Sequence, residues 1–304
     1  MFARGARFKA MRICSLLPSA TDIVAALGHA DSLVGISDEC RWPPEVRGKP
    51  VVTAARIDPA KLTSREIDEA VRASVLDGGS LYALDAELIE ALEPDLIVTQ
   101  DLCAVCAVSG GDVASAVPVD VEVLSLDPRT LGEVANTFRT LATRLGTPER
   151  GKELANAFEA TIGEVAEAMR GLEPRRVFFA EWLEPPFCAG HWIPEMIDLA
   201  GGSDVIGKPG VPSRTTTWVE ALAGEPELVI LAPCGFGAEE ALRRAAGLSF
   251  PCRAVAVDGD GYYSCPGPRL AQGVRQLAHL FHPEAAENPG LPALDLEPAY
   301  SQRL

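Results

Sequence analysis

The chain has 304 residues, of which 47% are hydrophobic and 23% charged, a composition typical of a globular protein with room for two domains. Its formal net charge of −16 argues against nucleic acid as a partner, because a strongly acidic surface repels phosphate groups. No apolar run is long enough to predict direct insertion into a membrane.

The start of the chain gives no pattern of a signal peptide, since the apolar stretch that begins at Ile13 is broken at Pro18. The eight cysteines are scattered without a small disulfide framework, which predicts reduced thiols. As written, the sequence therefore predicts a cytoplasmic protein. A true start further upstream would instead predict a periplasmic or extracellular one.

The first half of the chain alternates short apolar runs, which favour strands, with helical patterns. Pro18 ends the first apolar run, and Ser19 or Thr21 can cap a helix that continues to Gly28. Strands are predicted at 12–17, 33–36, 51–52, 95–99 and 121–124, and further helices at 64–75 and 83–92.

The longest helical stretch runs from Leu131 to Leu172 and is interrupted near Gly146, Thr147 and Pro148. Its second part begins with proline, a residue favoured at helix starts, and a helix of this length would span about 33 Å. It has no glycine- and serine-rich character, so we expect a stiff connection. Beyond it, strands are predicted at 176–180, 228–231 and 254–257, and helices at 193–200, 218–223, 239–246 and 269–281.

Two distant segments repeat one pattern, because the residues from Glu90 to Val98 reappear, with a two-residue insertion, from Glu220 to Ile230. In each copy a helical run stops before a proline, Pro94 or Pro226, an acidic residue follows, and an apolar strand begins. The repeat predicts one helix–turn–strand unit in two similarly built halves. We therefore expect a two-lobed α/β protein with a ligand cleft between its lobes.

The predicted domains follow the chain order. They are an N-terminal α/β lobe at 11–146, a linking backbone helix at 147–172, a C-terminal α/β lobe at 173–283 and a loose tail at 284–304.

Aromatic residues gather in the loops that follow the predicted strands, where open α/β sheets bind their ligands. These loops contain Trp42, Trp182, Trp192, Trp218, Phe236, Tyr262 and Tyr263. Each of these side chains could instead pack in a core. Their clustering nevertheless favours a broad apolar site for a large, flat, partly polar ligand.

Two cysteines and one histidine are candidates for metal or redox chemistry. Cys103 and Cys106 form a C-x-x-C pair, but a structural zinc site would need further ligands such as Cys40 and Cys234. A redox pair and two packed thiols are both open interpretations. His191 could ligate a metal within a bound ligand or simply donate a hydrogen bond. Nucleotide-binding and hydrolase motifs are absent from the sequence, which favours a binding protein over an enzyme.

Four segments carry a resemblance to a known family: Ser15 to Asp22, Glu87 to Val98, Pro185 to Gly190 and Pro266 to Leu270. They resemble the vitamin B12-binding protein family, the substrate-binding proteins of ABC transporters with the class III periplasmic-binding-protein fold. The resemblance extends from about Arg12 to Pro283 and implies two Rossmann-like lobes joined by a single long backbone helix, with a corrinoid held between them. The segments 65–82 and 101–109 depart from the simplest family members.

The resemblance also implies which residues face the ligand. Carried over by position, they are Pro18, Trp42, Arg56, Cys103, Trp182, His191, Phe236 and Tyr263, to which the aromatic loops add Trp192 and Trp218. His191 is a candidate axial ligand to the corrinoid cobalt. One exposed glutamate on each lobe, Glu87 and Glu220, is expected to dock on the transporter permease.

With this resemblance, the sequence predicts a monomeric, non-enzymatic protein, and the resemblance implies that it binds cobalamin or a related corrinoid for uptake or scavenging with an ABC transporter. It predicts no catalytic cofactor. Haem or a ferric siderophore is the alternative ligand, and a metal- or redox-active protein that uses Cys103, Cys106 and His191 is the alternative of another class.

Overall fold

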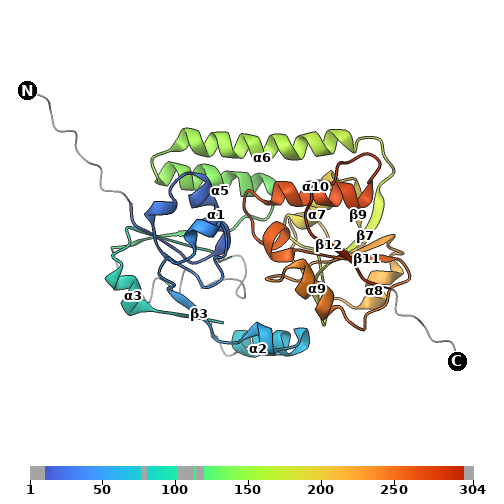
Figure 1. Cartoon of the computed structure of the whole chain (residues 1–304), viewed down its shortest axis with the longest axis horizontal. Helices are drawn as coiled ribbons and strands as arrows, with labels where there is room; N and C mark the ends of the chain where they lie inside the picture. Colours follow the sequence, from blue (N-terminus) through green and yellow to red (C-terminus); the bar gives the residue numbers. More distant parts are fainter. Residues whose placement is uncertain (1–10, 77–80, 102–112, 114–119, 298–304) are drawn as a thin grey trace, which may run out of the picture. The chain divides into compact units, whose positions relative to one another are not determined.

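The computed structural model describes residues 11–76, 81–101, 113 and 120–297, and its contacts divide the chain into two compact units. The first unit comprises Met1–Ile57, Ser74–Asp127 and Leu141–Pro148, and the second comprises Asp58–Ala73, Pro128–Thr140 and Glu149–Leu304. Each unit is built on its own mainly parallel sheet with helices packed against it (Figure 1). The predicted two-lobed α/β fold is therefore confirmed.

The sheet of the first unit has four parallel strands in the order β2-β1-β5-β6. All residues of β1 and β5 are buried, as expected for apolar strands that are covered on both faces. The strands are β1 (Ile13–Ser15), β2 (Leu33–Ile36), β5 (Leu96–Thr99) and β6 (Glu122–Ser125). This unit also contains the helices α1 (Pro18–Ala26) and α3 (Ala86–Ala91) and the antiparallel pair β3 (Thr53–Ala55) and β4 (Tyr82–Leu84).

The sheet of the second unit repeats this order, because β9-β7-β10-β11 are parallel in the same sequence of neighbours. Two antiparallel additions extend it, β8 as a hairpin with β7 and β12 along β11. Its strands are β7 (Arg175–Leu183), β8 (Pro186–Cys188), β9 (Gly202–Asp204), β10 (Leu228–Leu231), β11 (Arg253–Val257) and β12 (Ala293–Asp295). Its shorter helices are α7 (Ile193–Leu199), α8 (Trp218–Ala223), α9 (Ala238–Arg244) and α10 (Leu270–Phe281), and α2 (Ser64–Leu76) belongs to it as far as Ala73.

The sequence repeat corresponds to one backbone conformation that is used twice. Helix α3 leads into β5 through Glu93, with φ of 42°, and α8 leads into β10 through Glu225, with φ of 47°. Residues other than glycine rarely adopt positive φ, so the same unusual turn before each proline marks two equivalent connections.

The acidic residue after each proline has the same hydrogen bonds in both units. Asp95 Oδ2 accepts from the backbone N–H of Arg12 at 2.8 Å, and Glu227 Oε2 accepts from that of Arg176 at 3.0 Å. The backbone N–H groups of Asp95 and Glu227 donate in return to the carbonyls of the same two arginines. Each pair of bonds ties the start of the repeated strand to the start of its neighbour, which explains why the repeat requires an acid at this position.

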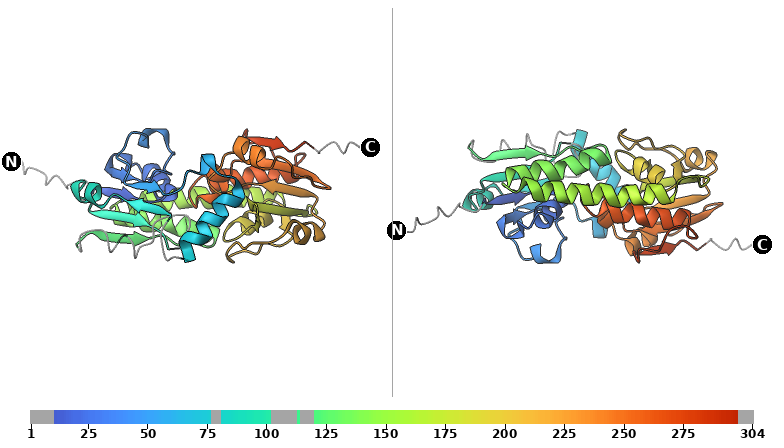
Figure 2. Two further views of the ribbon diagram at one scale, coloured as in Figure 1. Left: turned by 90° about the horizontal axis from the view of Figure 1, so that it is seen from below. Right: turned by 90° about the horizontal axis from the view of Figure 1, so that it is seen from above.

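Two long helices connect the units. Helix α5 (Leu131–Arg144) ends before Gly146. Helix α6 (Pro148–Ala168) begins next to Glu149, the first residue of the longest segment of the second unit. Within the second unit, Phe138 of α5 packs edge-on against Phe158 of α6, with ring centroids 5.4 Å apart. Helix α10 lies beside α6 (Figure 2), where Arg275 and Glu164 form an ion pair of 3.5 Å. None of the described helices is both long enough and apolar enough to cross a membrane.

Two predicted elements were wrong. The segment 83–92 is not one helix, because Tyr82–Leu84 pairs with β3 and the helix begins only after Asp85, whose side chain accepts from the N–H of Leu88. The strand predicted at 51–52 is reduced to a single bridge between Ile36 and Val51, and the strand that forms lies two residues later.

The end of the chain is not a loose tail as far as the structure describes it. Residues Ala293–Asp295 form β12, and Arg253 pairs with Asp295 at 2.6 Å. The other predicted domain limits stay a prediction. They follow chain order, whereas the contacts group Asp58–Ala73 and Pro128–Thr140 with the second unit.

Candidate functional site

Three predicted ligand residues lie after strands of the first unit. Pro18 is half-buried and begins α1 just after β1. Trp42 is 45% exposed in the loop that follows β2. Arg56 is exposed and follows β3 directly, and its backbone N–H donates to the carbonyl of Leu81 at 2.8 Å.

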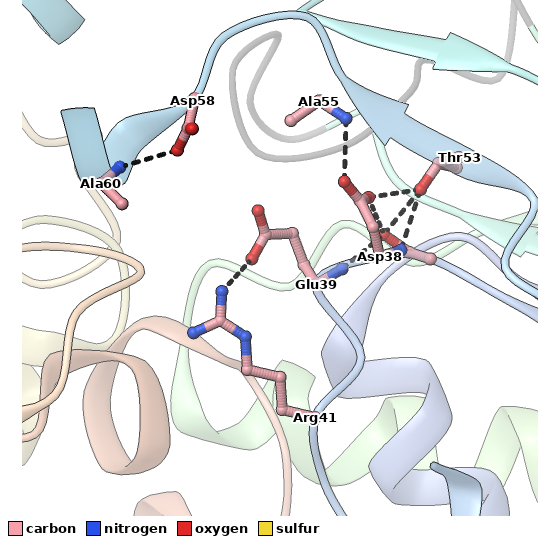
Figure 3. A network of polar contacts seen from close by, with 8 residues as sticks. Asp38, Glu39, Arg41, Thr53, Ala55, Asp58 and Ala60 are labelled. Carbon is pink, nitrogen blue, oxygen red and sulfur yellow. Dashed lines mark hydrogen bonds and ion pairs between the residues drawn. The ribbon is translucent and has the colours of Figure 1, made fainter. Parts of the chain in front are cut away.

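The loop before Trp42 is held in place by Asp38, which is bonded to β3 (Figure 3). Asp38 Oδ1 accepts from Thr53 Oγ1 at 2.6 Å, and Asp38 Oδ2 accepts from the backbone N–H of Ala55 at 2.8 Å. In the same loop Glu39 and Arg41 form an exposed ion pair of 3.2 Å. The polar network thus fixes the backbone of the loop that carries Trp42.

In the second unit, Trp182 and Phe236 form an aromatic pair with ring centroids 5.9 Å apart and an interplanar angle of 38°. Both side chains are partly exposed. The guanidinium of Arg244 lies 4.0 Å from the centroid of the Phe236 ring, at a distance suited to a cation–π interaction. The indole N–H of Trp182 donates to the backbone carbonyl of Ser64 at 3.1 Å.

His191 lies in a strained loop of the same unit, with φ of 52°. Its backbone N–H donates to Val211 at 2.7 Å, and the preceding Gly190 leaves no room for a Cβ, which would come within 2.1 Å of the backbone of Ser213. The imidazole is half-buried, and burial together with the nearby charge of Arg129 lowers the pKa of His191. The ring is therefore neutral at pH 7, the form that can coordinate a metal.

Two residues that were predicted to face the ligand lie in the core instead. Tyr263 is 0% exposed, and its hydroxyl donates to Gln276 Oε1 at 2.7 Å. Trp192 is 5% exposed, and its indole N–H donates to the carbonyl of Tyr263 at 2.8 Å. Buried side chains whose polar atoms are already bonded within the protein offer no surface to a ligand, so these two assignments are corrected.

Trp218, which was also predicted to face the ligand, packs mainly against other aromatic rings of its own unit. Its ring is edge-on to Phe178 at 5.6 Å and to Phe250 at 4.9 Å, at the border of the core of the second unit. Its partial exposure leaves little of the indole for any other contact.

Cys103 and Cys106 lie outside the described residues. Within the described part of the chain, no group of three or more histidine, cysteine, aspartate or glutamate side chains could hold a metal ion. Burial raises the pKa of Cys40 to about 11 and that of Cys14 to about 12, so both thiols stay protonated at neutral pH.

A family model described as periplasmic binding protein matches residues 13–249. The chain belongs to this family. Its members are substrate-binding proteins of ABC transporters, not enzymes. The chain is 23% identical to the vitamin B12-binding protein of Vibrio cholerae over 224 residues, covering 73% of this chain and 70% of that protein. It is likewise 23% identical to the vitamin B12-binding protein of Pectobacterium atrosepticum over 279 residues, covering 88% and 86%.

Solved structures share the fold of this periplasmic binding protein. The periplasmic haem-binding protein RhuT from Roseiflexus sp. RS-1, in its apo form, superimposes with a TM-score of 0.67 at 24% identity, covering 91% of this chain and 100% of that one. At this identity the match supports the class of fold.

The two glutamates expected to dock on a permease occupy different positions in their helices. Glu87 is exposed two residues after Asp85, the N-cap of α3. Glu220 is exposed three residues after Thr217, the N-cap of α8, and its carboxylate is bound by neighbouring side chains of its own unit. The position equivalent to Glu87 is occupied by Val219, whose side chain is 82% exposed.

Sequence reasoning missed Arg244 and Ser64, the two residues that hold the aromatic pair Trp182 and Phe236. Arg244 lies on an ordinary charged helix end, and Ser64 contributes only a backbone carbonyl. Neither has a motif around it.

A buried carboxyl group beneath the His191 region carries a pH-dependent contribution to stability. Burial raises the pKa of Asp204 to about 6, although the backbone N–H groups of Phe179, Ile206 and Gly207 donate to its carboxylate. The folded state therefore keeps this proton to higher pH than the unfolded chain does. The resulting stabilisation is complete below the unfolded pKa near 3.8 and is lost as the pH rises through about 6.

We expect the free energy of unfolding of the wild type, relative to Asp204→Asn, to fall by about 2–3 kcal/mol between pH 4 and pH 7. Urea unfolding at several pH values measures this difference. The exposed Asp120→Asn is the matched control for the removal of one carboxylate. A difference between wild type and Asp204→Asn that stays constant with pH would contradict the assignment.

Proposed function

We propose that this periplasmic binding protein binds cobalamin or a closely related corrinoid and delivers it to an ABC transporter. The observation that carries the proposal is the alignment with relatives described as vitamin B12-binding proteins, which extends along 88% of the chain and so includes strands and strand-end loops of both units.

The side chains after the strands suit a large flat ring with polar edges. Trp42, Trp182 and Phe236 offer partly exposed aromatic faces, and Pro18 adds an apolar edge. Arg56 supplies an exposed cation that can donate to amide or carboxylate groups at the ring periphery. We assign these residues, together with His191, to the ligand, with apolar contact as the main source of affinity.

Haem is the second candidate, because haem-binding proteins are among the solved structures with the same fold. The neutral imidazole of His191 could coordinate either haem iron or corrinoid cobalt. The corrinoid is preferred since it is the ligand in the names of relatives that align over most of their own length.

Titration of the purified protein with hydroxocobalamin, haemin and a ferric siderophore, followed by calorimetry and visible spectra, tests the ligand. We expect saturable one-to-one binding of hydroxocobalamin and weaker binding of the other two. Tight binding of haemin without any binding of hydroxocobalamin would establish the second candidate. Absence of binding to any of the three would overturn the proposed function.

Docking on a permease belongs to the same proposal, with Glu87 as the stronger of the two contacts because the carboxylate of Glu220 is bound to Arg214 and Thr216. The family name and the names of the relatives favour a location outside the cytoplasmic membrane. Fractionation of expressing cells by osmotic shock, with a cytoplasmic marker enzyme as control, distinguishes this location from the cytoplasm.

A further inference from the structure

The strands β3 and β4 form a short antiparallel pair, but the segment that connects them is unusually long. Ala55 is paired with Tyr82, and the backbone N–H of Arg56 donates to the carbonyl of Leu81 at 2.8 Å. The chain between Arg56 and Leu81 thus leaves and returns at neighbouring points. We call its described part, residues 58–76, the strap; it contains the 3₁₀ turn Pro59–Lys61 and the helix α2.

Arg244 anchors the first part of the strap. Its side chain is only 6% exposed, and its guanidinium donates to the carbonyl of Pro59 at 2.8 Å and to that of Leu62 at 3.1 Å. The same guanidinium stacks on Phe236 and pairs with Glu240. The buried guanidinium of Arg244 therefore contacts both the strap and Phe236, one of the two rings of the aromatic pair.

The start of α2 contacts the other half of the aromatic pair. The indole N–H of Trp182 donates to the carbonyl of Ser64, and Arg65 Nε donates to Glu184 Oε1 at 3.0 Å. Further along the helix, Arg72 donates to Thr215 Oγ1 at 3.2 Å. The strap thus lies directly on Trp182 and on the loop that follows it.

The strap is attached mainly by polar contacts. Among the apolar side chains of α2 that the structure describes, only Ile67 is buried, while Leu76 is 86% exposed. The ion pair between Arg65 and Glu184 is more than half exposed on the arginine side, and pairs of this kind stabilise a structure weakly. Such a segment can detach while the sheet below it stays folded.

We propose that the strap is a gate over the aromatic part of the ligand site, which a ligand must displace both when it enters and when it leaves. The proposal rests on the assignment of Trp182 and Phe236 to the ligand under the proposed function. Because the strap accepts a hydrogen bond from the indole N–H of Trp182, its release and reclosure limit the rate of ligand exchange.

The pairing of β3 with β4 allows the strap to be deleted without changing either strand. Replacing residues 57–80 by Asn-Gly joins Arg56 to Leu81 through a two-residue turn of the kind that favours hairpins, so β3 and β4 can stay paired. Arg65→Ala is the milder variant, which weakens the strap without shortening the chain. Lys61→Ala is its matched control, since Lys61 pairs only with Asp58 of the strap itself among the described contacts.

Stopped-flow mixing and displacement with hydroxocobalamin, or with haemin if the wild type binds that instead, measure both rates. We expect association and dissociation each to accelerate about tenfold or more without the strap, and severalfold in Arg65→Ala, with Lys61→Ala unchanged. Unchanged rates, or acceleration of only one of the two, would overturn the gate.

Hydrogen exchange in the absence of ligand separates this result from a failure of the proposed function. Loss of the strap should speed hydrogen exchange in the peptides that contain Trp182 and Phe236. Unchanged exchange would show that the strap does not cover these two residues. A wild type that binds none of the ligands would overturn the proposed function, whereas binding with unchanged rates would overturn only the gate.

Discussion

His191→Asn is expected to weaken the binding of hydroxocobalamin about 100-fold and to abolish the shift of its visible spectrum, a loss of about 2.7 kcal/mol. The imidazole is neutral, half-buried and held in a loop by bonds of its own backbone, so it is ready to coordinate cobalt. Asparagine is the suitable replacement because it tolerates the positive φ of 52° at this position better than alanine does. Calorimetry and spectra measure the two effects.

The pH dependence provides an independent check on His191. Burial, together with the charge of Arg129, lowers its pKa, so the imidazole stays unprotonated below the usual value near 6.5. Coordination should therefore persist to a lower pH than a histidine with the ordinary pKa would allow, and be lost on further acidification. A spectral shift that is the same in wild type and His191→Asn would show that the ligand is held without His191.

Tyr263→Ala is expected to lower the free energy of unfolding by about 3–5 kcal/mol, the range for removing a large buried aromatic side chain. The ring is completely buried against Phe179, and its hydroxyl donates to Gln276 Oε1, which would lose this donor. Urea unfolding measures the change. If the ring instead faced the ligand, the variant would stay stable and lose only affinity.

The neighbouring aromatic residue offers a matched control for Tyr263. Tyr262 precedes it in the same turn but is partly exposed, with the guanidinium of Arg269 5.8 Å from its ring centroid. Tyr262→Ala should therefore lower the free energy of unfolding by less than half as much as Tyr263→Ala does. Equal losses in the two variants would contradict the difference in burial.

Much of the fold was predictable because its signals are local. The repeat around Pro94 and Pro226 predicted two equivalent connections, and the structure shows the same positive φ before each proline. The run of buried residues in β5 and the long α6 follow from apolar periodicity within one segment. The pairing of β3 with β4 was missed because short strands separated by a long connection leave no periodic pattern.

The site was predictable only in part, since the chemistry of a side chain does not say whether it is buried. Phe236 and Tyr263 are both aromatic residues after strands, yet one is partly exposed and the other lies in the core. The offset between the two candidate docking glutamates was visible in the spacing to each proline, but the exposure of Val219 at the equivalent position was not.

Local patterns in the chain thus specify the α/β class, the repeated helix–turn–strand unit and the strand-end loops in which ligand residues must be sought. The choice among the aromatic residues, the neutral imidazole of His191 and the placement of the strap on Trp182 depend on contacts between residues far apart in the chain. The buried Arg244 illustrates the reason, because its bonds to Pro59 and Leu62 cross about 180 residues and exist only after the second unit has folded around them.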